Sequence, residues 1–246
     1  MAVDRAVALG AVPRARVVDG VVALSLVGVA AIAWWGAVSA PMPMALPAFL
    51  LGWVVMMTAM MLPALVPVVA LYQRAARRGT VAPVPVFLAG YLAVWAVPGI
   101  PAYFVWHAMQ PAVMDGRTWT GLVAGGALIL AALYQLTSFK AACLRGCRSP
   151  FTAFTTVRGS LADPRVALRV GARNGLWCLG CCWALMTVLV AVGVMQPWWM
   201  VGLATLIFAE KASPWGPALS RPLGLALGAL GVTLLAQPQL LMTYSI

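Results

Sequence analysis

Acidic residues and histidine are scarce in this chain, whose 246 residues include five Asp or Glu and a single His. Charged residues of both signs make up 9% of the sequence and hydrophobic residues 63%, which excludes a soluble globular protein. The four Asp lie in predicted loops or tails, and the sequence has no GxxxxGK phosphate-binding loop. These absences disfavour a Ser/His/Asp hydrolase and an ATP-driven transporter, so we do not expect an enzyme.

Long apolar runs occupy most of the chain instead. A helix of about 20 apolar residues crosses a bilayer core about 30 Å thick. We therefore predict an all-α, polytopic transmembrane bundle that forms a single domain over residues 1–246. One run is short, so six spans are the alternative to seven. The seven runs are residues 20–38, 46–72, 84–109, 119–139, 176–195, 198–208 and 222–236.

The basic residues predict the orientation. With seven alternating spans, every Lys and Arg except Arg117 falls on the side of the N-terminus. Cytoplasmic loops collect Lys and Arg, so we predict a cytoplasmic N-terminus. Short basic loops beside membrane spans account for the net charge of +11, so the expected partner is the lipid bilayer and not nucleic acid. Within the basic cytoplasmic connection 140–175, residues 164–174 predict an amphipathic helix at the membrane surface.

Two methionine pairs, Met56 with Met57 and Met60 with Met61, lie one helical turn apart in the second run. A thioether is a soft, uncharged donor that costs little to bury, so this cluster suits Cu(I). The alternative is that these methionines only fill gaps between packed helices.

All five cysteines lie at the predicted cytoplasmic ends of two consecutive spans. Cys143 and Cys147 are spaced i, i+4, and Cys178, Cys181 and Cys182 are spaced i, i+3, i+4, so each set lies on one helical face. Disulfides are not expected on the reducing cytosolic side. Four thiolates would suit Zn(II) and two or three would suit Cu(I), whereas buried cysteines also occur simply as small hydrophobic residues.

The predicted soft-metal ligands are therefore sulfur-bearing side chains from three spans. They are Met56, Met57, Met60, Met61, Cys143, Cys147, Cys178, Cys181, Cys182 and, one turn beyond Cys182, Met186.

Four polar residues also fall close to the predicted inner face. We expect Glu210 and Lys211 to form an interfacial ion pair, because an unpaired charge near hydrocarbon is costly. The alternative is that Glu210 assists a cation or a proton. Gln135 is expected to cross-link helices, and Lys140 to extend its ammonium group toward the interface.

Four strings occur in order between Trp53 and Lys211: MMTAMMLP at 56–63, YQLTSFK at 134–140 followed by Cys143 and by CRSP at 147–150, GLWCLGCCWALM at 175–186, and EK at 210–211. In these strings the chain resembles a bacterial family of predicted metal-binding integral membrane proteins, a domain of unknown function. The resemblance implies a metal-binding protein of the bacterial inner membrane, without specifying an ion or a reaction.

Three functional hypotheses follow. The first is a membrane protein that binds a soft metal, Cu(I) or alternatively zinc, and transports it or delivers it to a metal-accepting partner. The second is an accessory or assembly subunit of a larger membrane enzyme with no transport activity of its own. The third and weakest is a thiol redox protein that uses Cys178 and Cys181 as a Cys-x-x-Cys pair.

Overall fold

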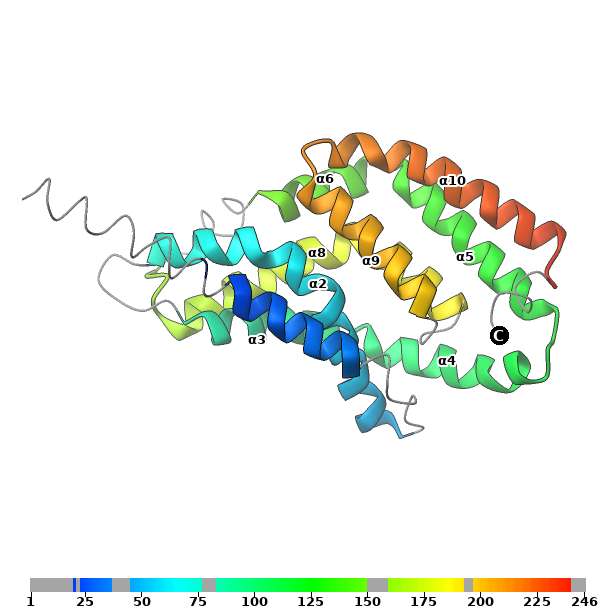
Figure 1. Cartoon of the computed structure of the whole chain (residues 1–246), viewed down its shortest axis with the longest axis horizontal. Helices are drawn as coiled ribbons and strands as arrows, with labels where there is room; N and C mark the ends of the chain where they lie inside the picture. Colours follow the sequence, from blue (N-terminus) through cyan, green and yellow to red (C-terminus); the bar gives the residue numbers. More distant parts are fainter. Residues whose placement is uncertain are drawn as a thin grey trace, which may run out of the picture.

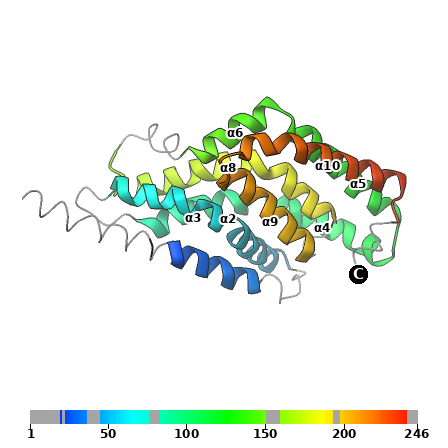
Figure 2. The ribbon, with the colours of Figure 1, turned by 45° about the horizontal axis from the view of Figure 1, so that its top comes forward.

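The structure is a computed structural model that describes residues 20, 23–36, 45–76, 83–149, 159–192 and 197–239. This part of the chain is built of helices and contains no strand, which confirms the predicted all-α class. A short apolar helix, Ala23–Gly36, comes first. The labelled helices (Figures 1 and 2) are α2 (Leu46–Ala76), α3 (Val84–Ala96), α4 (Gly99–Met114), α5 (Trp119–Gln135), α6 (Ser138–Arg148), α8 (Pro164–Val192), α9 (Pro197–Ala212) and α10 (Gly216–Ala236).

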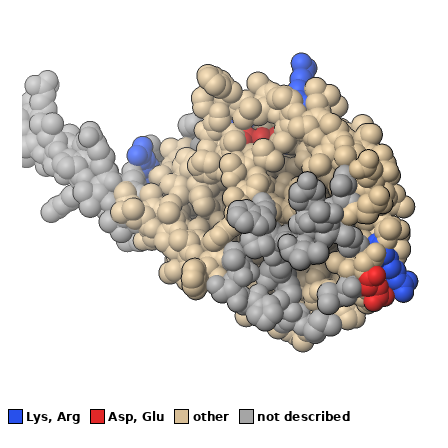
Figure 3. All heavy atoms as spheres, turned by 45° about the vertical axis from the view of Figure 1, so that its right-hand side comes forward, with Lys and Arg blue, Asp and Glu red and all other residues tan. Residues whose placement is uncertain are grey.

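Several helices have the length and composition of membrane spans. Four stretches of the described chain qualify, and a fifth does so if the bent pair α5 and α6 counts as one span. Figure 3 shows a face on which charged side chains are few and scattered, as lipid contact requires. The chain is a helical membrane protein, and the count of seven or six spans stays a prediction. The four stretches are Leu46–Arg74, Val84–Val113, Pro164–Val192 and Gly216–Ala236.

Helix α8 contacts α3, α5, α6 and α9. Glycines allow its close approach to α3: a Cβ on Gly171 would overlap the carbonyl of Phe87, and a Cβ on Gly175 would lie 3.0 Å from the carbonyl oxygen of Tyr91. Small residues at such contacts let membrane helices associate through van der Waals packing. This packing brings Tyr91 beside the face of α8 that carries Cys178.

Helix α8 begins at Pro164, whereas the fifth apolar run predicts a span that begins at residue 176. The Asp163 carboxylate accepts a hydrogen bond from the backbone N–H of Arg165 at 2.8 Å, and a proline at the first helical position has no N–H to leave unpaired. Residues 164–174 are therefore continuous with the span, and their contact with the membrane surface stays a prediction. Cys178 consequently lies near the middle of a 29-residue helix and not near its start.

The fourth predicted span, residues 119–139, is broken in the structure. Helix α5 ends at Gln135, and the chain bends by 73° into α6. Thr137 causes the break, because its backbone is extended and its hydroxyl accepts a hydrogen bond from the N–H of Lys140 at 3.1 Å as the N-cap of α6. The buried face of α6 carries Cys143 and Cys147. The bend thus places both thiols against α8 instead of on a straight extension of α5.

Candidate metal centre

The thiol of Cys178 lies where four helices meet. Its Sγ is 2.8 Å from the hydroxyl oxygen of Tyr91 on α3, 2.8 Å from Nζ of Lys211 on α9, and 3.9 Å from Sδ of Met61 on α2. Cys178 is 1% exposed and Met61 is fully buried. Sulfur atoms that are 117 residues apart in the chain are therefore in contact inside the protein.

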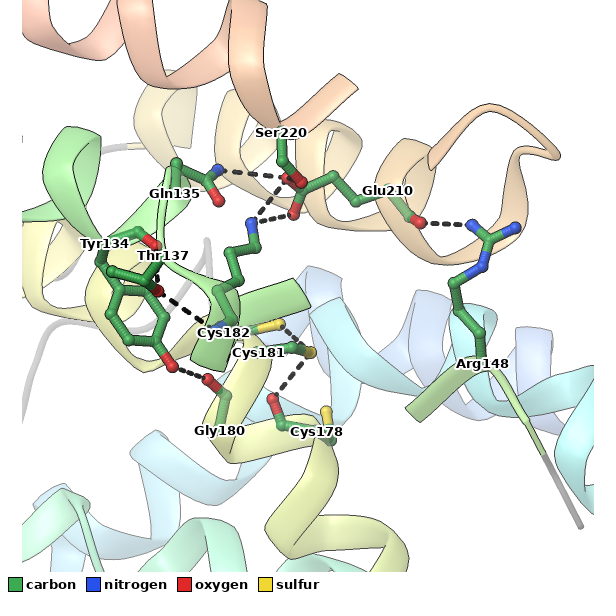
Figure 4. Close-up of polar contacts among 11 residues, drawn as sticks. Tyr134, Gln135, Thr137, Arg148, Cys178, Gly180, Cys181, Cys182, Glu210 and Ser220 are labelled. Carbon is green, nitrogen blue, oxygen red and sulfur yellow. Dashed lines mark hydrogen bonds and ion pairs between the residues drawn. The ribbon is translucent and has the colours of Figure 1, made fainter. Parts of the chain in front are cut away.

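Three further thiols surround Cys178. Sγ of Cys181 lies 3.3 Å from Sγ of Cys182 and donates a hydrogen bond to the backbone carbonyl of Cys178 at 3.1 Å (Figure 4). Cys147 on α6 is close enough to Cys178 and Cys181 to interact with both, and it lines a small cavity together with Met61 and Lys211. All of these cysteines are free, buried thiols. We refer to Met61, Cys147, Cys178, Cys181 and Cys182 as the sulfur cluster.

Cys143 lies apart from the sulfur cluster. Its sulfur packs over Gly180, where an added Cβ would lie 2.7 Å from Sγ. The Tyr134 hydroxyl donates a hydrogen bond to the carbonyl of Gly180 (Figure 4). Among the contacts described for Cys143, none is with the other four thiols. Although Cys143 and Cys147 are spaced i, i+4 on α6, they have different neighbours. Cys147 lies in the sulfur cluster, and Cys143 packs against the backbone of α8.

The other predicted methionine ligands are also buried. Met56, Met57 and Met60 belong to the same hydrophobic core as Met61 and the five cysteines, and no contact of their sulfur atoms with a thiol is described. Met186 lines an apolar cavity of about 340 Å³ together with Trp53 and Trp183. Among the five methionines predicted as metal ligands, Met61 is the one for which a contact between its sulfur and a thiol is described.

A buried polar network lies next to the cluster. Both carboxylate oxygens of Glu210 accept hydrogen bonds from Nζ of Lys140, at 2.6 and 2.7 Å, and one also accepts from Gln135 at 3.2 Å and from Ser220 at 3.1 Å (Figure 4). The guanidinium of Arg148 donates to the backbone carbonyl of Glu210 at 2.5 Å. These bonds tie α5, α6 and α10 to the C-terminal turn of α9.

This network corrects two sequence predictions and confirms a third. Glu210 pairs with Lys140 and not with Lys211, because consecutive residues of a helix point in different directions. Lys140 is 1% exposed, so its ammonium group is buried in an ion pair and does not extend to the interface. Gln135 does cross-link helices, as predicted, by joining α5 to α9.

The arrangement is chemically suited to a soft cation. Thiol and thioether donors from α2, α6 and α8 converge, and the local hydrogen-bond partners are a tyrosine hydroxyl and an ammonium group. Within the described residues, no group of three or more His, Cys, Asp or Glu side chains is placed to hold a metal ion. A tetrahedral zinc site would need four such ligands, whereas Cu(I) also accepts a thioether donor such as Met61.

Two residues of this region were not predicted from the sequence. Tyr91 occurs in an apolar run as an ordinary core aromatic residue, and Asn174 lies four residues before Cys178 in a stretch read as a surface helix. The i, i+4 spacing of Asn174 and Cys178 was the one available signal, since it places both side chains on one face of α8.

Comparison with known proteins agrees with this donor chemistry. The family model described as "PpoB2: Copper chaperone" matches residues 50–234, which is more than half of the chain and includes every predicted ligand. No curated protein matches the chain, and no solved structure matches it. The chain belongs to the PpoB2 family of copper chaperones.

Proposed function

We propose that this protein binds Cu(I) as its cargo at the sulfur cluster and passes the ion to a copper-accepting partner. The observation that carries the proposal is the contact of Cys178 on α8 with Met61 on α2 in a buried position, with Cys147 of α6 beside it. Membership of a copper chaperone family supports copper as the ion.

The proposed ligands are two thiolates and one thioether. Cys178 provides the central thiolate, and Cys147 of α6 or Cys181 of the next turn of α8 provides the second. Met61 adds a neutral donor that holds Cu(I) without adding negative charge to a buried site. Cys182, 3.3 Å from Cys181, supplies an alternative thiolate during ligand exchange.

The methionines of α2 supply a route toward this site. Met57 and Met61 are spaced i, i+4 and therefore lie on one stripe of the helix, with Met56 and Met60 on the adjoining stripe. All four side chains are buried. We propose that Cu(I) reaches Cys178 along these weaker thioether donors, so that affinity increases along the path as thioethers give way to thiolates.

The partner takes copper by ligand exchange at the protein's thiolates. In this proposal the protein resides in the bacterial inner membrane, and the receiver is a copper-using enzyme or a second copper carrier. Direct delivery keeps Cu(I) away from other thiols, which is the chemical reason for a chaperone. If the receiving protein lies in the cytoplasm, this delivery amounts to inward transport of the ion.

Anaerobic copper binding to the purified protein in detergent tests the proposal. Wild-type protein should retain about one Cu(I) per chain against the chelator bicinchoninate, and Cys178→Ser should lose it because the central thiolate is absent. Cys143→Ser is the matched control, since Cys143 is a buried thiol of α6 outside the cluster. Equal copper retention by the two variants would contradict the proposed ligand set.

The same preparation separates the two other hypotheses. An accessory subunit would copurify with stoichiometric partners, and its association would be indifferent to Cys178→Ser. A thiol redox protein would show a change of Cys178 and Cys181 between free thiols and a disulfide when the redox potential is varied. If wild-type protein holds no copper and copurifies with such partners, the accessory-subunit hypothesis replaces the copper proposal. If it holds no copper and its thiols form a disulfide, the redox hypothesis replaces it.

A further inference from the structure

Lys211 has an unusual set of neighbours for a lysine in a membrane protein. Its Nζ lies 2.8 Å from Sγ of Cys178 and 3.4 Å from Sδ of Met61. In the described part of the chain it forms no ion pair with a carboxylate. The ammonium group therefore takes its stabilisation from sulfur.

The nearest carboxylate is already engaged. Glu210 precedes Lys211 directly, but both of its oxygens accept hydrogen bonds from Lys140. The chain contains two lysines, so each has its own partner: Lys140 the carboxylate, and Lys211 the sulfur cluster. A cation in a low-dielectric interior requires such a partner, and Lys211 supplies positive charge at the place where Cu(I) is proposed to bind.

A small cavity adjoins Lys211. It has a volume of about 30 Å³, and its polar lining consists of Tyr91, Asn174, Lys211 and Arg148, whose guanidinium donates to the backbone carbonyl of Glu210. Met61 and Cys147 of the sulfur cluster also line it. A space of this size holds one water molecule or one ammonium group. The cavity therefore offers room for the Lys211 ammonium next to its present position.

Asn174 offers a second partner at this cavity. The residue is 1% exposed, and neither its amide nitrogen nor its amide oxygen has a hydrogen-bond partner among the described residues. Leaving a buried polar group unpaired is costly, so such groups are normally satisfied in at least one state of a protein. The free amide oxygen is an acceptor suited to an ammonium group.

We propose that Lys211 is an exchangeable counter-cation of the copper site. Cu(I) displaces the Lys211 ammonium from Cys178 and Met61, and the ammonium moves into the cavity and donates a hydrogen bond to Asn174. At Cys178 and Met61 two N–H···S contacts are replaced by Cu–S bonds, with Cys178 a thiolate in both states, and no electron moves. The second thiol that becomes a ligand releases its proton to the solvent, and the displaced ammonium balances the charge of that second thiolate. The return of Lys211 to the sulfurs assists release of the ion. This inference rests on the proposed copper function.

Lysine-selective NMR tests the displacement directly. Protein labelled with ¹³C at lysine Cε has two signals, from Lys140 and Lys211, and Lys211→Met identifies which is which. Cu(I) is diamagnetic, so loading in detergent should shift the Lys211 signal in step with retained copper and leave the Lys140 signal unchanged. Retained copper with an unchanged Lys211 signal would overturn the inference and leave the proposed function intact. Failure of the wild-type protein to retain copper would overturn both.

A double-mutant cycle tests the role of Asn174. Asn174→Leu should weaken Cu(I) binding about tenfold, since the displaced ammonium loses one charged hydrogen bond. The apo protein should unfold at the same or a higher temperature, because an unpaired buried amide has been removed. In a Lys211→Met background the same substitution should leave copper affinity unchanged. An equal loss of affinity in both backgrounds would show that Asn174 acts independently of Lys211 and would refute the proposal.

Discussion

The hydroxyl of Tyr91 on α3 lies 2.8 Å from Sγ of Cys178 on α8, and the two residues are 87 positions apart in the chain. The contact depends on the close packing of α3 against the glycines of α8. It gives the proposed copper thiolate a hydrogen-bond donor that is independent of Lys211.

Tyr91→Phe should therefore weaken Cu(I) binding by about three- to tenfold, which is the net value of one hydrogen bond. The measurement is competition with bicinchoninate under anaerobic conditions. Tyr72→Phe is the control, because the Tyr72 hydroxyl donates to the backbone carbonyl of Leu161. Equal effects of the two substitutions on copper affinity would show that the Tyr91 hydroxyl does not act on the site.

Methionine replacements distinguish a ligand from a packing residue. Met61→Leu keeps the approximate volume of the side chain and removes its sulfur, so it should lower Cu(I) affinity about tenfold or more while changing stability by less than about 1.5 kcal/mol. Met186→Leu, in the apolar cavity, should leave copper affinity unchanged. Titration with Cu(I) measures the copper affinity of both variants. A Met61→Leu variant with the affinity of the wild type would show that Met61 is not a ligand.

The contact between α3 and α8 is expected to be intolerant of added volume. Gly171→Ala should destabilise the protein by about 2 kcal/mol or more, because its Cβ would overlap the backbone carbonyl of Phe87 and backbone cannot move aside cheaply. Gly126→Ala in α5 is the matched control, since a Cβ there meets nothing within 4 Å and alanine favours a helix by about 1 kcal/mol. Thermal unfolding in detergent should lower Tm for the first variant and leave it equal or higher for the second. Comparable Tm values would contradict the close approach.

The buried ion pair between Lys140 and Glu210 is expected to show strong coupling. Lys140→Met alone should cost about 3–5 kcal/mol of unfolding free energy, because it leaves the Glu210 carboxylate buried without its cation. Adding Glu210→Gln should recover part of that loss, since no uncompensated charge then remains. Unfolding measurements on the two single variants and the double variant provide the test. Additive losses would mean that the two side chains do not interact in the folded protein.

The sequence predicted the helical membrane class well, because long apolar runs have few alternatives in a bilayer. It predicted the boundaries less well at two places. The predicted helix 164–174 does begin at Pro164, but it continues without a break into the span expected from residue 176, and Thr137 ends the predicted fourth span early. The early end is a capping effect of a single polar residue, which a count of hydrophobic residues does not detect.

Residue type alone determined the chemistry that this protein can offer: soft sulfur donors, very few carboxylates and two lysines in an apolar chain. Only the tertiary structure decided which donors meet. The bend before α6 brings Cys147 to Cys178 and leaves Cys143 outside. The glycine contacts of α8 bring Tyr91, and Met61 comes from α2, which packs against α3 and α9. The same packing pairs Glu210 with Lys140 and places the ammonium group of Lys211 against the sulfur cluster. Spacing along one helix specifies a face, whereas the neighbours of that face depend on how other helices pack against it.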